Sequence, residues 1–168
     1  VRVEALGQIS EKKRVWARNA LKELLDDGRA LIRARALEAL RKIDGATSVT
    51  PLKLALASKH KDLRALALQA LTPLRAHSPL VPGLVAGLLT DAENTVRLTA
   101  LDELAKLYPA GSPEPLRVAY ERGGPQLKIE ALTRAARAGQ TRESIIAPLL
   151  VRGLDDADES VRRMAFTV

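Results

Sequence analysis

The side chains able to do metal, nucleophilic or acid–base chemistry are few in this sequence and stand far apart. His60 and His77 are the only histidines, and neither has a second histidine or a carboxylate at the i, i+4 spacing that puts two ligands on one helix face. There is no cysteine, which excludes disulfides, thiolate nucleophiles and cysteine-bound metals. We therefore expect no metal site and no cofactor.

Hydroxyl and carboxylate chemistry is equally unsupported. A serine nucleophile needs a base and a third group that orients the base, and no such set surrounds any serine, namely Ser10, Ser48, Ser58, Ser78, Ser112, Ser144 and Ser160. The Gly-Gly-Pro at 123–125 predicts a turn, because no Gly-Lys-Ser/Thr follows it as in a phosphate loop. The acidic pairs at 26–27 and 155–156 stand at expected helix ends, where capping is the expected role. The sequence thus predicts a non-catalytic protein.

Positive charge is concentrated in the first half of the chain. The net charge is +7, and residues 1–84 hold 16 Lys/Arg against 8 Asp/Glu, whereas residues 85–168 hold 11 against 12. Sequence-independent binding to phosphates would need such cations on one connected surface, and the candidates form a basic patch of Lys12, Lys13, Arg14, Arg18, Lys59 and Lys61. With 2% aromatic residues, the chain offers little for stacking on bases. Nucleic acid is therefore the alternative partner.

One residue pattern recurs along the whole chain and sets where these side chains lie. The Val96-Arg97 pair is followed four and five residues later by Ala100 and Leu101. The same frame begins at Val1, Ile32, Leu63, Leu127 and Val161. With Val96 in its place in the series, the spacings are 31, 31, 33, 31 and 34. A steady period in this range indicates a stacked array of repeats. We expect one domain over residues 1–168 and expect it to be a fragment of a longer array.

The apolar spacing predicts helices and no sheet. Helix stops are expected at Asp27-Gly28 and Asp44-Gly45, and Pro73 should kink or end its helix. A helix end is also expected near Ser10, and Trp16 is expected in the core. The expected helices are 1–9, 10–25, 30–43, 50–57, 62–74, 81–90, 94–108, 114–121, 125–138, 143–154 and 159–168. They make five hairpins preceded by half a repeat.

This pattern resembles the HEAT repeat, in particular the short bacterial repeats of phycobilin-lyase-like proteins. Aspartate five residues before the anchor and arginine one residue after it fill the family's positions at Asp27, Asp91, Asp156, Arg33, Arg97 and Arg162. We expect these six residues to form a structural ladder, with the aspartate at a helix start and the arginine bridging to the next corner. Ser58 and Arg122 replace the aspartate, and Lys128 replaces the arginine, so two corners are expected to differ.

The resemblance implies an all-α, right-handed α-solenoid whose second helices line a concave side. Exposed positions there would be Val3, Glu4, Arg35, Glu38, Leu66, Gln69, Leu98, Thr99, Asp102, Ile129, Glu130, Thr133, Arg163, Met164 and Thr167. Their mixed charge and apolar content favour a protein partner over a phosphate track, although burial between repeats could equally explain Val3, Leu98 and Ile129.

We therefore expect a cytoplasmic scaffold that binds another protein, with no membrane and no small-molecule substrate. Sequence-independent nucleic-acid binding is the alternative. An enzyme resembling HEAT-like bilin lyases or DNA glycosylases is a weaker one, because the basic half offers only Trp16 as an aromatic side chain.

Overall fold

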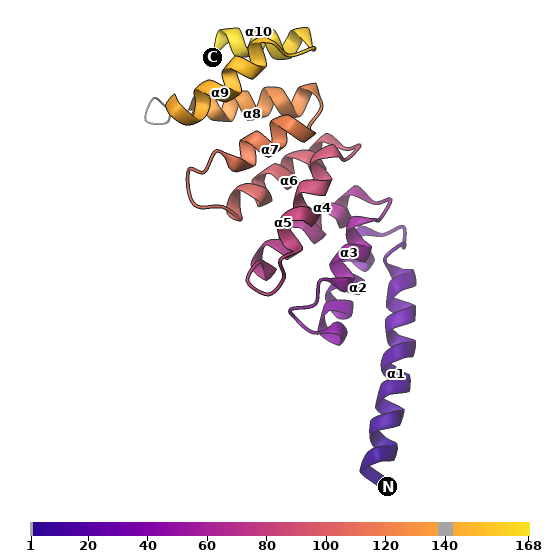
Figure 1. Cartoon of the computed structure of the whole chain (residues 1–168). Helices are drawn as coiled ribbons and strands as arrows, with labels where there is room; N and C mark the ends of the chain where they lie inside the picture. Colours follow the sequence, from indigo (N-terminus) through magenta and orange to yellow (C-terminus); the bar gives the residue numbers. More distant parts are fainter. Residues whose placement is uncertain (1, 138–142) are drawn as a thin grey trace. The chain divides into compact units, whose positions relative to one another are not determined.

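The computed structural model describes residues 2–137 and 143–168, and it describes side chains for residues 13–137 and 147–168. Within these ranges every regular element is helical and no strand is present, as the apolar spacing predicts. The chain divides into two compact units, residues Val1–Ser78 and Pro79–Val168. Consecutive helices pack on one another inside each unit (Figure 1). The expectation of a single domain stays a prediction.

The first unit contains two helical hairpins. Its elements are α1 (Arg2–Leu24), α2 (Ala30–Asp44), α3 (Thr50–Leu56), α4 (Lys61–Leu71) and the short 3-10 helix η1 (Thr72–Leu74). Helix α1 packs on α2 and α3 packs on α4, while α2 also contacts both α3 and α4. The predicted stop at Asp44-Gly45 is confirmed, because Gly45 has a φ of 94° that favours glycine. Pro73 ends α4 as predicted, since the chain tightens into η1 there.

The second unit contains three hairpins. Its elements are α5 (Val81–Gly87), the 3-10 helix η2 (Leu88–Thr90), α6 (Asn94–Lys106), α7 (Glu114–Arg122), α8 (Pro125–Arg137), α9 (Glu143–Leu154) and α10 (Glu159–Thr167). The paired helices are α5 with α6, α7 with α8, and α9 with α10. Helix α8 also packs on α10, as α2 does on α4 in the first unit. The predicted end of α8 at Ala138 lies outside the described residues.

The repeated apolar positions form the core of both units. Leu63, Val96, Leu127 and Val161 from the anchor position are all at most 1% exposed. The leucines five residues later are also buried at Leu37, Leu68, Leu101 and Leu132, each at most 2% exposed. Removing such leucines from water is the main favourable term in folding. The sequence register therefore identified most of the buried face of the second helices, including Val96, Leu101 and Leu104. Two positions depart from it: Ile32 in α2 is half-buried, and Phe166 in α10 is 85% exposed.

The first helix differs from the prediction. No break occurs near Ser10, and α1 runs without interruption from Arg2 to Leu24. Ser10 is followed by charged residues rather than by glycine or proline, and serine inside a helix costs only about 0.5 kcal/mol relative to alanine. A continuous helix is therefore lower in free energy than a helix broken at Ser10. The expected leading half repeat is the N-terminal part of α1. The side chains of residues 1–12 lie outside the described part of the structure.

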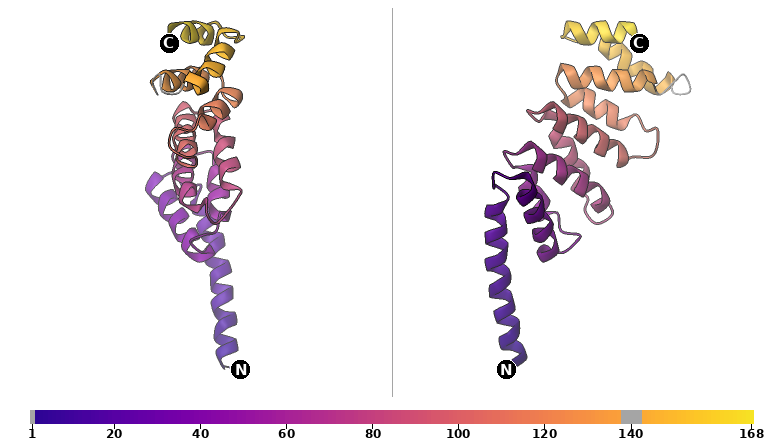
Figure 2. Two further views of the ribbon diagram at one scale, coloured as in Figure 1. Left: turned by 60° about the vertical axis from the view of Figure 1, so that its left-hand side comes forward. Right: turned by 180° about the vertical axis from the view of Figure 1, so that it is seen from behind.

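Trp16 is not in the core, and this prediction is wrong: the side chain is 74% exposed. Arg18 forms an ion pair with Asp44, the last residue of α2, and so marks the level at which α2 ends. Helix α1 extends past this level (Figure 2), because it has 23 residues and α2 has 15. The neighbouring Val15 is also exposed, at 48%, so this turn of α1 is not packed against another helix.

Four of the corners between paired helices, all except that between α7 and α8, share one hydrogen-bonding arrangement. A side-chain oxygen accepts from the backbone N–H two residues later, immediately before the second helix begins. The bonds are Asp27 Oδ1 from Arg29 N (2.8 Å), Ser58 Oγ from His60 N (3.1 Å), Asp91 Oδ1 from Glu93 N (2.9 Å) and Asp156 Oδ1 from Asp158 N (3.0 Å). Ser58 thus makes the bond that aspartate makes elsewhere, so the second corner is built like its neighbours.

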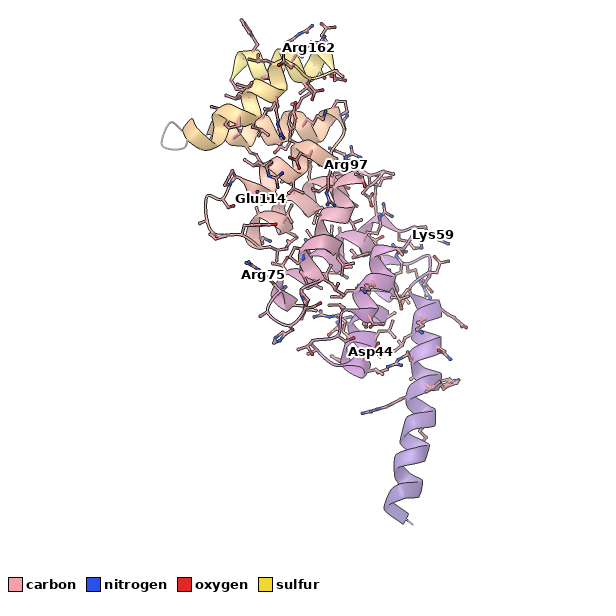
Figure 3. All side chains as sticks on the ribbon, in the orientation of Figure 1. Asp44, Lys59, Arg75, Arg97, Glu114 and Arg162 are labelled. Atoms are coloured by element: carbon pink, nitrogen blue, oxygen red, sulfur yellow. The ribbon has the colours of Figure 1, made fainter. Side chains whose placement is uncertain are left out.

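The arginine of the pattern closes the same corners from the other side. Its Nη1 donates to the carbonyl oxygen six residues earlier, with distances of 2.7 Å (Arg33 to Asp27), 2.9 Å (Arg64 to Ser58), 2.7 Å (Arg97 to Asp91) and 2.7 Å (Arg162 to Asp156). Two of them also reach the next hairpin of their own unit: Arg33 Nη2 donates to Asp62 Oδ2 at 2.7 Å, and Arg97 Nη2 donates to Gln126 Oε1 at 3.0 Å. Figure 3 labels Arg97 and Arg162 at their corners.

The corner between α7 and α8 is built differently, as the replacements at Arg122 and Lys128 led us to expect. Gly123 is buried here, and a Cβ added to it would lie 2.6 Å from the Ala119 carbonyl oxygen. Lys128 donates to Asp156 Oδ2 at 2.7 Å, and Tyr120 OH donates to the same oxygen at 2.6 Å. The lysine therefore joins this hairpin to the aspartate of the last corner instead of closing its own.

Candidate interaction surface

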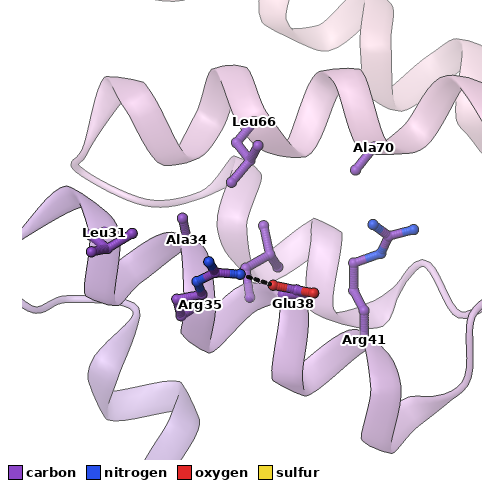
Figure 4. A pocket seen from close by; sticks show the side chains of 8 residues that line it. Leu31, Ala34, Arg35, Glu38, Arg41, Leu66 and Ala70 are labelled. Carbon is purple, nitrogen blue, oxygen red and sulfur yellow. Dashed lines mark hydrogen bonds and ion pairs between the residues drawn. The ribbon is translucent and has the colours of Figure 1, made fainter.

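A hollow of about 290 Å³ lies between the two second helices of the first unit, α2 and α4. We call it the α2–α4 groove (Figure 4). Its apolar lining is Leu31, Ala34, Leu37, Leu66 and Ala70, and its charged lining is Arg35, Glu38 and Arg41. Leu31 is 67% exposed and Leu66 is 36% exposed. Apolar side chains therefore remain open to solvent on this surface, with charges beside them.

The groove contains three residues that sequence spacing had placed on the concave side, Arg35, Glu38 and Leu66. Gln69 is exposed on α4 but does not line the groove. Sequence reasoning missed Leu31 and Arg41. Continuing the helical spacing from Arg35 and Glu38 by one turn in each direction would have found both, because residues three and four apart share a helix face.

Two of the three charges in the groove neutralise each other. Arg35 Nη1 lies 3.0 Å from Glu38 Oε2, and Lys42 Nζ lies 3.3 Å from Glu38 Oε1. Hydrogen bonds from Arg35 and then from Lys42 lower the pKa of the Glu38 carboxyl below its usual range. Glu38 is therefore a paired carboxylate at neutral pH, and it is a poor proton acceptor.

The corresponding surface of the second unit is more closed. Leu98, Thr99, Ile129, Thr133 and Met164 are half-buried. Thr133 Oγ1 donates to Ile129 O at 2.8 Å and lies 3.8 Å from Met164 Sδ, and Thr99 Oγ1 donates to Thr95 O at 2.8 Å. These side chains are partly covered by their own and neighbouring helices. They therefore offer a partner less exposed apolar surface than the α2–α4 groove does.

The charged positions of that surface are internally paired. Arg134 bridges Asp102 and Glu130, with N–O distances of 2.6 Å to each carboxylate. Arg163 is paired with Glu159 at 2.6 Å, and Thr167 Oγ1 donates to Arg163 O at 2.8 Å. The remaining predicted concave positions, Val3 and Glu4, have side chains outside the described residues. The second unit therefore shows a polar surface already satisfied by its own contacts.

The basic patch does not gather in one place. Lys59 Nζ pairs with Asp26 Oδ2 at 2.7 Å, next to the start of α2, whereas Arg18 pairs with Asp44 at the end of α2. The 15 residues of α2 separate these two pairs by about 22 Å, and Figure 3 shows Lys59 and Asp44 apart. Lys13, Arg14 and Lys61 are exposed, and the Lys12 side chain is not described.

Histidine chemistry finds no support in the described side chains. His60 Nε2 lies 3.2 Å from Asp26 Oδ1, and His77 is exposed after η1. No group of three or more histidine and carboxylate side chains suited to a metal is found among the described residues. In the same part of the chain, no helix combines the length and the apolar content that a membrane span needs.

Comparison with protein-family models gave no match, and a search of curated proteins gave none either. The resemblance to HEAT repeats therefore continues to rest on the repeated residues of the sequence itself.

Proposed function

We propose that this chain is a non-catalytic protein-binding module built as a HEAT-like, right-handed solenoid, and that a partner protein docks in the α2–α4 groove. The observation that carries the proposal is the exposure of Leu31 and Leu66 in a hollow between two packed helices. The solenoid is supported by the recurring register of apolar and corner residues and by the consecutive packing of helices within each unit.

The groove has the composition of a protein interface. Such interfaces combine an apolar centre with a polar rim, and the large apolar side chains at the centre supply most of the binding free energy. In the groove, leucine and alanine side chains lie between α2 and α4, while Arg35 and Glu38 stand beside them as an ion pair. A partner that covers the leucines removes them from water without first breaking that pair.

A catalytic role for the groove is disfavoured by the side chains that line it. The apolar members cannot transfer protons, and Glu38 is held as a paired carboxylate by Arg35 and Lys42. Arginine stays protonated at any physiological pH. The groove therefore offers surface for binding, with no nucleophile or general base directed into it.

Affinity capture tests the proposal. The 168-residue chain and its Leu66→Asp variant are used as baits in lysate of the source organism, and captured proteins are identified by mass spectrometry. The matched control is Leu54→Asp, because Leu54 is 42% exposed, close to the 36% of Leu66, and lies on α3 outside the groove. We expect a partner that the wild type and Leu54→Asp retain and that Leu66→Asp loses. Equal capture by all three folded baits would show that the groove is not the docking site.

A further inference from the structure

Arg41 is the one charge in the lining of the α2–α4 groove that has no counter-ion there. Glu38 is shared between Arg35 and Lys42, and no carboxylate among the described side chains pairs with Arg41. The Arg41 Nε is buried and has no hydrogen-bond partner. Figure 4 shows the guanidinium at the Ala70 end of the groove, directed away from the Arg35–Glu38 pair.

Two other arginines of the first unit with a buried Nε differ from Arg41, because each has a carboxylate partner. Arg18 and Arg33 also have a buried, unbonded Nε. Both nevertheless hold a carboxylate through Nη2, since Arg18 pairs with Asp44 and Arg33 pairs with Asp62. A half-buried guanidinium beside apolar side chains loses hydration, and an ionised partner at this position would restore the lost interactions.

We infer that the α2–α4 groove binds an acidic segment of a partner protein, with an aliphatic side chain against Leu31 and Leu66 and a carboxylate on Arg41. This inference rests on the proposed function and names the chemistry of the partner. A carboxylate matches the planar guanidinium through two parallel hydrogen bonds. The apolar lining fits a protein segment better than a nucleic-acid backbone, because a phosphate chain has no aliphatic group to cover the leucines.

The length of the groove sets the spacing of the two groups in the partner. Leu31 and Arg41 are ten residues apart on α2, which corresponds to about 15 Å along the helix axis. An extended segment covers that distance in about four to five residues, and a helical segment covers it in about ten. The bound segment therefore carries its aliphatic and acidic residues at one of these two separations.

The test uses fluorescein-labelled peptides with blocked termini, each carrying one leucine and one glutamate in a glycine, serine and alanine background. The leucine–glutamate separation runs from two to ten residues, and each peptide has a twin with glutamine in place of glutamate. Binding to the full 168-residue chain is measured by fluorescence anisotropy. We expect binding at a separation near five or near ten, and a loss of about tenfold in affinity for the glutamine twin, the size of a hydrogen bond to a charged group.

Variants of Arg41 identify the contact. In Arg41→Gln the glutamate and glutamine peptides should bind equally, and in Arg41→Glu the preference should turn to a lysine-containing peptide. Lys53→Gln is the charge-matched control, because Lys53 is exposed on α3 and does not line the groove. It should keep the wild-type preference. Circular dichroism of each variant checks that it is folded.

The outcomes separate this inference from the proposed function. If glutamate and glutamine peptides bind alike to the wild type, or if no peptide binds, the acidic partner is wrong, while partner capture lost in Leu66→Asp would still support the groove as a docking site. If Arg41→Gln keeps the glutamate preference, the carboxylate lies elsewhere and the inference is wrong. Binding of labelled duplex DNA that only Arg41→Gln weakens would overturn it in favour of phosphate recognition.

Discussion

Arg33 and Asp62 form an ion pair in which Nη2 and Oδ2 lie 2.7 Å apart, and it joins α2 to the first turn of α4. The two partners differ in burial: the Arg33 side chain is 7% exposed, and the Asp62 side chain is 44% exposed. Arg33 also donates to the Asp27 carbonyl oxygen at 2.7 Å. The buried arginine therefore binds both the corner before α2 and the first turn of α4, whereas its exposed partner mainly neutralises its charge.

Arg33→Ala should lower the free energy of unfolding by about 2–4 kcal/mol, because it removes a buried side chain and leaves a carbonyl and a carboxylate without their donor. Asp62→Ala should cost less, about 1–2 kcal/mol, because the buried Arg33 loses its carboxylate but keeps its bond to the Asp27 carbonyl oxygen, and the vacated site is open to water. Urea denaturation measures both. Arg29→Ala is the control, because Arg29 is 75% exposed and its loss should change stability by less than about 0.5 kcal/mol. Equal losses for Arg33 and Arg29 would contradict the structural role of the buried pair.

Stability should fall with acid through Asp156. Burial alone would raise the pKa of this carboxyl, but hydrogen bonds from Lys128, Tyr120 and the Asp158 backbone outweigh it and lower the pKa from 3.8 to about 2. The unfolded chain therefore binds more protons between these values, so stability is present above about pH 4 and is lost as the pH falls toward about 2. Asp156→Asn should flatten this part of the curve of unfolding free energy against pH.

Asp155→Asn is the control for this measurement, because the Asp155 side chain next in sequence is exposed. Its curve between about pH 4 and pH 2 should run parallel to that of the wild type. If both asparagine variants keep the wild-type slope, the acid sensitivity comes from other carboxylates, of which Asp27 is the first to examine because hydrogen bonds from Arg29 lower its pKa to about 2.

Gly123→Ala should be destabilising by about 1–3 kcal/mol, because the added Cβ meets the Ala119 carbonyl oxygen at 2.6 Å and Leu127 Cβ at 2.7 Å in a packed region. Gly124→Ala is an adjacent control with no atom within 4 Å of its added Cβ. Thermal unfolding of the two variants should show a lower midpoint for the first and little change for the second. Similar unfolding midpoints would mean that the α7–α8 corner adjusts to the added methyl group at little cost in free energy.

Ser58→Ala should cost about 1 kcal/mol, because it removes the acceptor for the His60 N–H. Ser58→Asp should retain the bond and the stability of the wild type, since aspartate makes the same bond at Asp27, Asp91 and Asp156. Chemical denaturation compares the two. Equal stability of the alanine and aspartate variants would show that this corner does not depend on its side-chain acceptor.

The helices were largely predictable because each second helix repeats the same apolar spacing, and burial follows that spacing directly at Leu68 and Leu101. The continuous α1 was not predictable from the repeat, because the pattern at its N-terminal end is that of a separate helix while the local residues contain no breaker. The exposure of Trp16 could not be predicted from its residue type, because a large apolar side chain is expected in the core. Whether a neighbouring helix covers a residue depends on the tertiary structure, which the hydrophobicity of that residue does not indicate.

The candidate site was predictable in part. Helical spacing placed Arg35, Glu38 and Leu66 on one surface, and the structure brings these three together in the groove. The importance of Arg41 could not be read from the sequence, because it depends on which cation Glu38 pairs with. Lys128 is a second such case: the sequence showed a replaced arginine, but only the fold places Asp156 within its reach.

The corner bonds have a consequence for how such a chain can change over generations. Asp27 and Arg33 satisfy the corner that holds them, using an acceptor two residues from its donor and a carbonyl six residues back. All the residues that form such a corner are close together in the sequence, so they are copied, deleted or exchanged together with their gene segment. The link to the following hairpin is less specific, since the equivalent guanidinium donates to Asp62 Oδ2 in one place and to Gln126 Oε1 in another. A duplicated hairpin therefore retains the hydrogen bonds of its own corner. To bind the next hairpin, its arginine needs only a hydrogen-bond-accepting oxygen there.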